Sequence, residues 1–487
     1  MPAERFGQIG RLLEGAGRGT QAFRRAWAPE RQIDTALFSA ALLLLVVSAA
    51  FGGASQTNAL SLMGVELASL PLLTLSIYLP LAGAAPTGSA VPLGIALAIV
   101  FVPALQILPL PFALWSQLPG RGIVIQALEV THLGRASLPF SLAPQQTWRA
   151  LLALAPPLAM FVGGLMLSEG QRRVMAGLWL GLAVASLCLG GLQMLSGEDS
   201  PLYFYEVTNA GSPVGFFSNR NHQAEFLLCL IPLAAVFAAR FEGRFDTPRA
   251  FPALAAMLYV FVAIAGVAAT RSRAGIALAA VALLCSAAIV LRGDAVRRHW
   301  RAAAGLGLGV AIAIGGVLAF GLGPIMQRFD SGGEPRFEGW PIVMRAAAAF
   351  LPLGSGVGSF EAVYGAAEPL SQVTPIYFNH AHNDYLELWL ETGLVGAALL
   401  AAFLGWFGWR AAAIWRRRLS AGGSGLAAAC TALVGLVLAH STVDYPLRTE
   451  TIAVLFAFAC STIAVWRPDA DIRLRVRRSD GRRTIRL

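Results

Sequence analysis

Residues 379–384 bring together two histidines, two asparagines and an aspartate, in a stretch, NHAHNDYLELWLETGLVG, that continues to residue 396. An imidazole titrates near neutral pH and can accept or orient a proton. His382 is therefore the first candidate for a catalytic base, with His380 beside it, and the alternative is a histidine in a surface loop. The apolar residues that follow predict that this chemistry lies where a helix begins.

Arginines on the predicted outer side of the membrane form a second group of candidates. An arginine within a membrane costs roughly 2.5 to 3.5 kcal/mol, so each one needs a partner there. A guanidinium group is permanently charged and binds phosphate oxygens in pairs, so several arginines together can neutralise a diphosphate. Contact with lipid headgroups is the alternative for any single arginine. The group consists of Arg220, Arg271, Arg273, Arg328, Arg336, Arg345 and Arg448.

Carboxylates follow the histidines along the same predicted helix. Asp384 and Glu387 have the spacing of a capping box, which predicts that the helix begins here. Glu387 and Glu391 fall on one helix face, where they are costly unless an arginine meets them. Further along the chain, Asp444 is expected to form a structural pair with Arg448.

The HxHxD pattern also occurs as a ligand spacing in zinc hydrolases. No clear further cluster of histidine, cysteine or acidic residues completes a ligand shell in the sequence. The five cysteines fall in apolar runs and form no CxxC pair. We therefore expect neither a metal site nor disulfides.

The elements that carry these residues are predicted to be membrane helices. The chain has 487 residues, of which 56% are hydrophobic and only 13% charged, and this is too apolar for a soluble protein. A spanning helix needs about 20 apolar residues. Twelve such runs begin near Ala36, Ala59, Ala90, Trp148, Val174, His222, Phe251, Ala274, Ala302, Tyr385, Gly425 and Glu450. We expect an all-α polytopic membrane protein with about twelve transmembrane helices.

The net charge of +10 comes from arginines, which we interpret as topology signals and not as a nucleic-acid site. Both ends of the chain are rich in arginine, so both termini are expected in the cytoplasm. The predicted organisation is a basic tail at 1–35, a membrane domain at 36–467 and a second basic tail at 468–487. No removable signal peptide is evident.

A long outer loop is expected at residues 324–384, and a loop of that length should have a fold of its own. Apolar residues recur there at helical spacing, with Arg345 off the stripe. We expect an amphipathic helix that lies on the bilayer surface. The stripe consists of Trp340, Ile342, Val343, Ala346, Ala347, Phe350 and Leu351.

These motifs together resemble a known family. His382 and Asn383, nine residues and then GLVG at 393–396 are similar to the signature of bacterial O-antigen ligases. GFFSNRNHQAE at 215–225, SRAG at 272–275 and RFEGWPIVMRAAAAFLPLGSGVGSF at 336–360 resemble the wider superfamily of O-antigen ligases and polysaccharide polymerases. The resemblance covers roughly residues 215–448.

The resemblance implies transfer of a glycan from an undecaprenyl diphosphate carrier to an acceptor hydroxyl, on the periplasmic face of the inner membrane and without a metal or cofactor. His382 matches the signature histidine and Arg336 matches the arginine that opens the long-loop helix. Arg273 is the favoured match of the TRSR pair, with Arg271 as the alternative. The implied catalytic residues are His382, Arg336 and Arg273, and the candidate substrate contacts are Arg220, Arg271, Arg345, His380 and Glu391.

The resemblance leaves the acceptor open. Another lipid-linked repeat unit would make the protein a polysaccharide polymerase, which we favour slightly, and the lipid A core would make it an O-antigen ligase. Inversion at the anomeric carbon is expected in either case. A transporter or flippase is the alternative from another class, since twelve spans with both ends inside also suit a carrier. Against it, the charged groups gather on one face, and Glu66 is the clearest isolated charge within a span.

Overall fold

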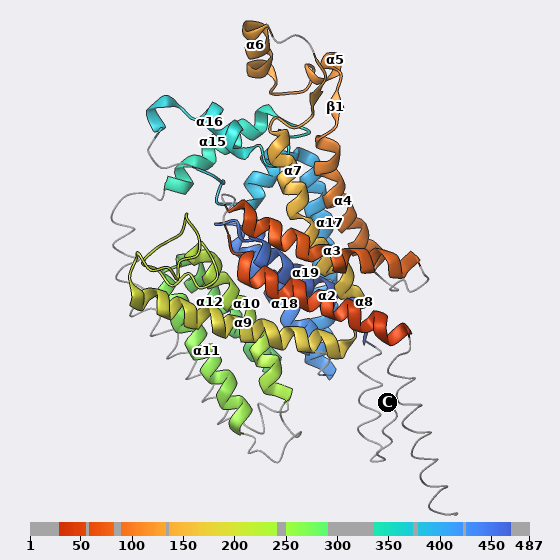
Figure 1. Ribbon diagram of the computed structural model, residues 1–487, viewed down its shortest axis with the longest axis vertical. Coiled ribbons are helices and arrows are strands. Elements are labelled where there is room, and N and C mark those ends of the chain that lie inside the picture. Colours follow the sequence, from red (N-terminus) through yellow and green to blue (C-terminus); the bar gives the residue numbers. More distant parts are fainter. Residues whose placement is uncertain are drawn as a thin grey trace, which may run out of the picture.

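The computed structural model describes residues 29–54, 58–81, 89–132, 136–240, 250–290, 335–373, 378–421 and 425–468, and these are mostly helical (Figure 1). The helices are α2 (Pro29–Phe51), α3 (Ala59–Leu81), α4 (Ala90–Gln106), α5 (Phe112–Trp115), α6 (Gly122–Thr131), α7 (Pro144–Ala153), α8 (Ala155–Met166), α9 (Glu169–Ser196), α10 (Arg220–Arg240), α11 (Ala250–Thr270), α12 (Arg273–Val290), α15 (Pro335–Ala349), α16 (Phe360–Ala367), α17 (Asp384–Ala421), α18 (Gly425–His440) and α19 (Glu450–Val465), with 3-10 turns η1 (Leu370–Gln372) and η2 (Pro446–Arg448). Two short strands, β1 (Pro109–Leu110) and β2 (Leu138–Pro139), pair antiparallel.

Seven helices in the described part of the chain are long and apolar enough to cross a membrane. They cover Gln32–Phe51, Ala59–Leu79, Pro144–Met166, Glu169–Ser196, Arg220–Ala239, Arg273–Val290 and Asp384–Arg418. The shorter apolar helices α4, α11, α18 and α19 occupy four further predicted runs. The prediction of a helical membrane protein with several spans is confirmed, whereas the number twelve stays a prediction. The run predicted near Ala302 and most of the two predicted tails lie outside the described residues.

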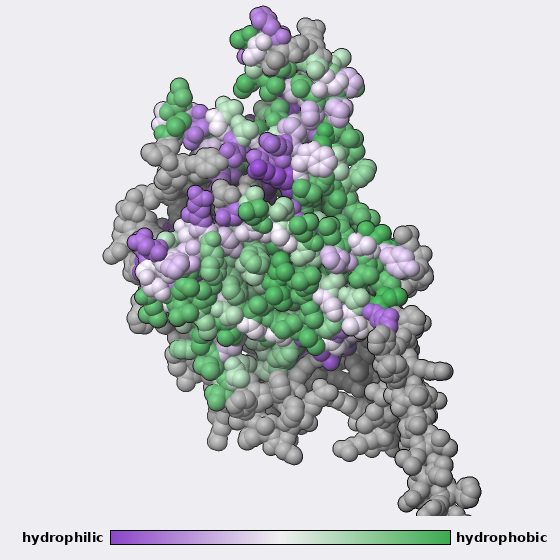
Figure 2. All heavy atoms as spheres, viewed as in Figure 1, coloured by the Kyte–Doolittle hydropathy of each residue, from purple (hydrophilic) through white to green (hydrophobic). Residues whose placement is uncertain are grey.

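Helices α10, α18 and α19 form the buried centre of the membrane domain. Most of α10 is buried inside the protein, and so are most residues of α18 and α19. Helix α10 packs against α11, α12 and α18, and α19 packs against α8, α18 and α2. Figure 2 shows apolar side chains over much of the body, while hydrophilic ones gather toward the end that carries α15 and α16. Such an apolar surface suits a lipid environment.

The stripe predicted for the long loop is present in α15, but protein covers it. Ile342 and Val343 are 3% and 2% exposed and belong to one buried cluster with Phe360 of α16 and Leu390 of α17. The expectation that this stripe lies on the bilayer surface is therefore wrong, because α16 and α17 fold back over it. Arg345 lies off the stripe and is exposed, as predicted.

Helix α15 is also tied to the polar residues that precede α17. The indole Nε1 of Trp340 donates a hydrogen bond to the carbonyl oxygen of Ala381, at 2.9 Å. Ala381 lies between His380 and His382, so α15 helps to fix the backbone that carries both imidazoles.

Candidate active site

Asn383, and not Asp384, caps α17. Its side-chain Oδ1 accepts hydrogen bonds from the backbone N–H groups of Tyr385 at 3.0 Å and Leu386 at 3.1 Å. The predicted capping box is therefore wrong, although the predicted helix start is right. The carboxylate of Asp384 instead accepts a hydrogen bond from the Ser441 hydroxyl at 2.8 Å. Sequence spacing alone did not distinguish two adjacent residues that can both cap.

His382 stands at this helix start with a buried carboxylate beside it. Its backbone has a positive φ of 49°, a conformation that is uncommon for residues other than glycine. Its Nδ1 is buried, lies 3.5 Å from Oδ1 of Asp444 and forms no hydrogen bond with the described residues, while 23% of the His382 side chain is exposed. A carboxylate at Nδ1 favours the tautomer in which Nε2 is the basic nitrogen. In that tautomer Nε2 is the ring nitrogen that can accept a proton.

Asp444 is held in place from the other side by α10. Its Oδ2 accepts a hydrogen bond from Nδ2 of Asn221 at 2.6 Å, and the residue is 1% exposed. Burial raises the pKa of Asp444, but the nearby His382, His222 and His440 outweigh this effect and hold the pKa well below its usual range. Asp444 is therefore a buried anion surrounded by imidazoles. We predicted a structural pair between Asp444 and Arg448, and this prediction is wrong. Arg448 pairs with other carboxylates in the described structure.

Three imidazoles pack around the ring of Tyr445. The distances from its ring centroid to those of His380, His382 and His222 are 4.4, 5.0 and 5.2 Å. Burial and the charge of Asp444 raise the pKa of Tyr445 above its ordinary value, so its hydroxyl stays neutral. The phenol ring thus fixes the spacing of the histidines without adding charge.

His380 differs from His382 in having a strong partner of its own. Its Nδ1 lies 2.8 Å from Oε1 of Glu387, and the residue is 4% exposed. The other oxygen of Glu387 accepts a hydrogen bond from the backbone N–H of Ala381 at 3.0 Å. We expected His380 to contact substrate, but its buried position favours a structural role.

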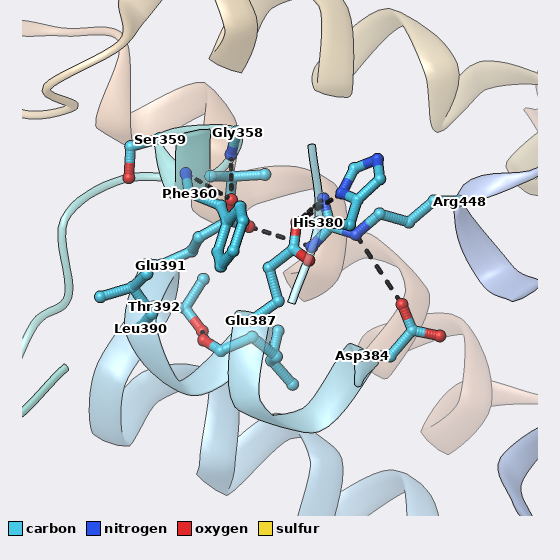
Figure 3. Close-up of polar contacts among 12 residues, drawn as sticks. Gly358, Ser359, Phe360, His380, Asp384, Glu387, Leu390, Glu391, Thr392 and Arg448 are labelled. Carbon is cyan, nitrogen blue, oxygen red and sulfur yellow. Dashed lines mark hydrogen bonds and ion pairs between the residues drawn. The ribbon is translucent and has the colours of Figure 1, made fainter. Parts of the chain in front are cut away.

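Arg448 meets all three carboxylates at the start of α17 (Figure 3). Its guanidinium nitrogens lie 3.7 Å from Asp384, 3.2 Å from Glu387 and 3.1 Å from Glu391. Burial lowers the pKa of Arg448, but the three carboxylates outweigh burial and raise the pKa above its ordinary value. The expectation that an arginine meets the two glutamates is confirmed. Because its charge is already matched, Arg448 is a poor candidate for binding a diphosphate.

Glu391 joins this cluster to the glycine loop, residues 353–359. Its Oε1 accepts hydrogen bonds from the backbone N–H groups of Gly358 at 2.8 Å and Phe360 at 3.3 Å, and its Oε2 faces Arg448 (Figure 3). Both oxygens are engaged and the residue is 1% exposed. The expected substrate contact of Glu391 is therefore replaced by a contact that holds the glycine loop against α17.

Gly393, the first glycine of the signature, serves this junction. Gly393 has a φ of 54°, and a Cβ there would lie 2.2 Å from the carbonyl oxygen of Pro352. This residue interrupts the regular helix, and the next N–H, of Leu394, donates to that same Pro352 oxygen at 2.8 Å. Gly393 thus allows α17 and the glycine loop to approach closely.

The structure reveals a third acid–histidine pair, which sequence reasoning missed. His440 at the end of α18 places Nδ1 2.7 Å from Oε2 of Glu225 in α10, and both side chains are fully buried. The two residues are 215 positions apart, so no local pattern joins them. The available signal was Glu225 itself, because a carboxylate within an apolar run requires a buried partner.

The predicted arginines are spread over several elements of the structure. Arg220 is the first residue of α10 and directly precedes Asn221, whose side chain contacts Asp444. Arg271 is exposed and has a φ of 54°, whereas Arg273 is half-buried at the start of α12. Arg336 lies in the first turn of α15, ahead of the residues whose side chains are described. Arg328 lies outside the described residues.

Comparison with known proteins agrees with the arrangement of these motifs. A family model described as O-antigen ligase matches residues 258–401, which include α12, α15, α16, His382 and the signature glycines. A search of curated proteins finds no match. The predicted resemblance is confirmed over the matched residues. Through this region the chain resembles the superfamily of O-antigen ligases and polysaccharide polymerases.

Proposed function

We propose that the protein transfers a glycan from undecaprenyl diphosphate to an acceptor hydroxyl on the periplasmic face of the bacterial inner membrane. The family match supports glycan transfer at a membrane in general. The observation that carries the finer proposal is the partly exposed His382 with buried Asp444 at its Nδ1, at the start of an apolar helix.

In the proposed reaction, the acceptor oxygen attacks the anomeric carbon from the side opposite the diphosphate. The bond between that carbon and the diphosphate oxygen breaks, the lipid diphosphate leaves, and the configuration inverts. Nε2 of His382 accepts the proton of the hydroxyl, and Asp444 stabilises the imidazolium that forms. This assigns Asp444 as the residue that positions and supports the base.

The leaving diphosphate needs positive charge, which we assign to Arg273 and Arg336. Arg220 and Arg271 are further candidates for the same group, because Arg220 adjoins the histidine cluster through Asn221. Charge concentrates on the diphosphate as the bond breaks, so arginine contacts that strengthen at that point lower the barrier. Arg345 is exposed on α15 and is retained as a candidate contact for the more distant part of the glycan or diphosphate.

The acceptor defines the biological role. We favour another lipid-linked repeat unit, which makes the protein a polymerase, and we keep the lipid A core, and thus a ligase, as the alternative. A transporter remains the candidate from another class, because several apolar helices also suit a carrier.

The test is the lipid-linked glycan profile of a strain that lacks the protein, complemented with the wild type or with His382→Ala. A polymerase predicts that single repeat units accumulate in both the deletion and the variant. A ligase predicts long lipid-linked chains together with a bare lipid A core. A profile that stays normal in the deletion strain would contradict glycan transfer and favour the transporter.

A further inference from the structure

We infer that Glu225 and His440 act as an inner acid–histidine pair that positions Asp444 and keeps His382 available as a base. This inference rests on the proposed function, because it assigns a role in the same transfer step. It concerns residues outside the family match at 258–401, on two helices of the buried core.

The pair itself is close and completely buried. His440 Nδ1 and Glu225 Oε2 are 2.7 Å apart, and neither side chain is exposed. The second oxygen of Glu225 accepts a hydrogen bond from the thiol of Cys229 at 3.1 Å. A carboxylate in such a position is costly unless a cation meets it, and the neighbouring imidazole can supply the charge.

His440 connects this pair to the candidate active site. Its other nitrogen, Nε2, lies 4.0 Å from Oδ2 of Asp444 and has no hydrogen-bond partner among the described residues. Oδ1 of the same carboxylate lies 3.5 Å from Nδ1 of His382. Glutamate, histidine, aspartate and histidine therefore follow one another from the core to the accessible ring.

The order of charges along this series gives His440 its role. Carboxylates on both sides of His440 favour its protonated form, and the resulting imidazolium compensates the buried charge of Asp444. Without that cation, Asp444 would draw a proton onto His382 to obtain a counter-ion. A protonated His382 cannot accept the proton of the acceptor hydroxyl, so the inner pair keeps the outer ring neutral and basic.

Other ionisable groups border the same series, and they must be held constant in a test. His222 and Cys229 face it from α10, Asp384 and His380 from the start of α17, and Tyr445 from the turn after α18. Asn221 also contacts Asp444 but carries no charge. The variants chosen below leave all of these side chains in place.

The experiment compares pH profiles of glycan transfer by purified, reconstituted protein with native lipid-linked glycan as substrate. The variants are His440→Gln and Glu225→Gln, which keep hydrogen-bonding groups and remove the charges. His132→Gln is the matched control, because His132 is exposed at the end of α6. We expect turnover near pH 7 to fall severalfold in both variants, with KM little changed.

The pH dependence separates this role from simple packing. Loss of the inner cation leaves the charge of Asp444 to attract a proton to His382, so the acidic limb of the profile should move up by about one pH unit and activity should recover in alkali. A wild-type limb in both variants, or an equal loss at every pH, would overturn the inference. The His132→Gln profile should match that of the wild type.

Two further measurements keep the outcomes distinct. Size-exclusion chromatography in detergent reports the folded amount of each variant, and rates are expressed per folded protein. If His440→Gln does not fold, Glu225→Gln decides by the same criterion, because its amide retains the size of the side chain. If His382→Gln is as active as the wild type, the proposed function has failed; if only the two inner variants behave like the wild type, this inference alone has failed.

Discussion

His380 and His382 are two residues apart, yet the protein holds them in opposite ways. His380 is 4% exposed and lies 2.8 Å from a glutamate that also faces Arg448. The His382 side chain is 23% exposed and lies 3.5 Å from its aspartate. The first imidazole belongs to a saturated ion cluster, and the second keeps an accessible edge. The difference shows that partner geometry, and not residue type, separates a structural histidine from a candidate base.

The comparison extends to the positive charges of the two regions. Arg448 faces three carboxylates, so the region around His380 is closed to a further anion. The region around His382 is bordered by α10, where Arg220 precedes Asn221. We infer that the first region builds the site and the second region carries out its chemistry.

The largest effect is expected for His382→Gln. Loss of a general base typically lowers turnover by about 10² to 10⁴-fold, so we expect about 10³-fold here, with folding unchanged. The measurement is the rate of transfer by reconstituted protein, with thermal unfolding in detergent as its companion. A variant that keeps wild-type turnover would remove His382 from the mechanism.

Arg448→Met tests the closed region. Removal of the guanidinium leaves Asp384, Glu387 and Glu391 as buried carboxylates without their shared cation, which should cost about 3 to 5 kcal/mol of stability. Thermal unfolding in detergent should show the loss directly. Normal stability together with weaker binding of lipid diphosphate would instead make Arg448 a substrate contact.

His380→Gln should have a smaller effect, mainly on stability. The glutamine keeps one polar contact with Glu387 but removes the ring that packs against Tyr445, at a cost of about 1 to 3 kcal/mol. Turnover per folded protein should stay within severalfold of the wild type. A loss of turnover as large as that of His382→Gln would erase the distinction between the two histidines.

Trp340→Phe should have the smallest effect. It removes the indole hydrogen bond to Ala381, which lies between the two histidines, and should lower stability by about 1 kcal/mol. Hydrogen exchange at residues 379–383 should rise, because this anchor holds their backbone. If hydrogen exchange at residues 379–383 does not change, the hydrogen bond from the Ala381 N–H to Glu387 is sufficient to hold this segment.

Sequence patterns identified the parts of this site that depend on local order. His382 before an apolar helix, the stripe in α15 and the need of two glutamates for an arginine all follow from spacing. The partner of Arg448 was predicted wrongly because Asp444 is near in sequence. Residues 446–448 form a 3-10 turn, so a four-residue spacing there does not place two side chains on one helix face.

The remaining features depend on contacts between distant segments. Glu225 meets His440 across 215 positions, and the glycine loop meets Glu391 across more than thirty. Only packing of α10 against α18, and of the loop against α17, brings these groups together. Burial of the α15 stripe has the same origin, since its apolar pattern fits either a bilayer or a protein surface.

Reconstitution of the purified protein with its lipid-linked glycan, followed by quantification of released undecaprenyl diphosphate, tests the central claim most directly. The account predicts that one lipid diphosphate is released for each new glycosidic bond, and that His382→Gln releases almost none. Movement of glycan across the membrane without bond formation, or release that does not depend on His382, would contradict it.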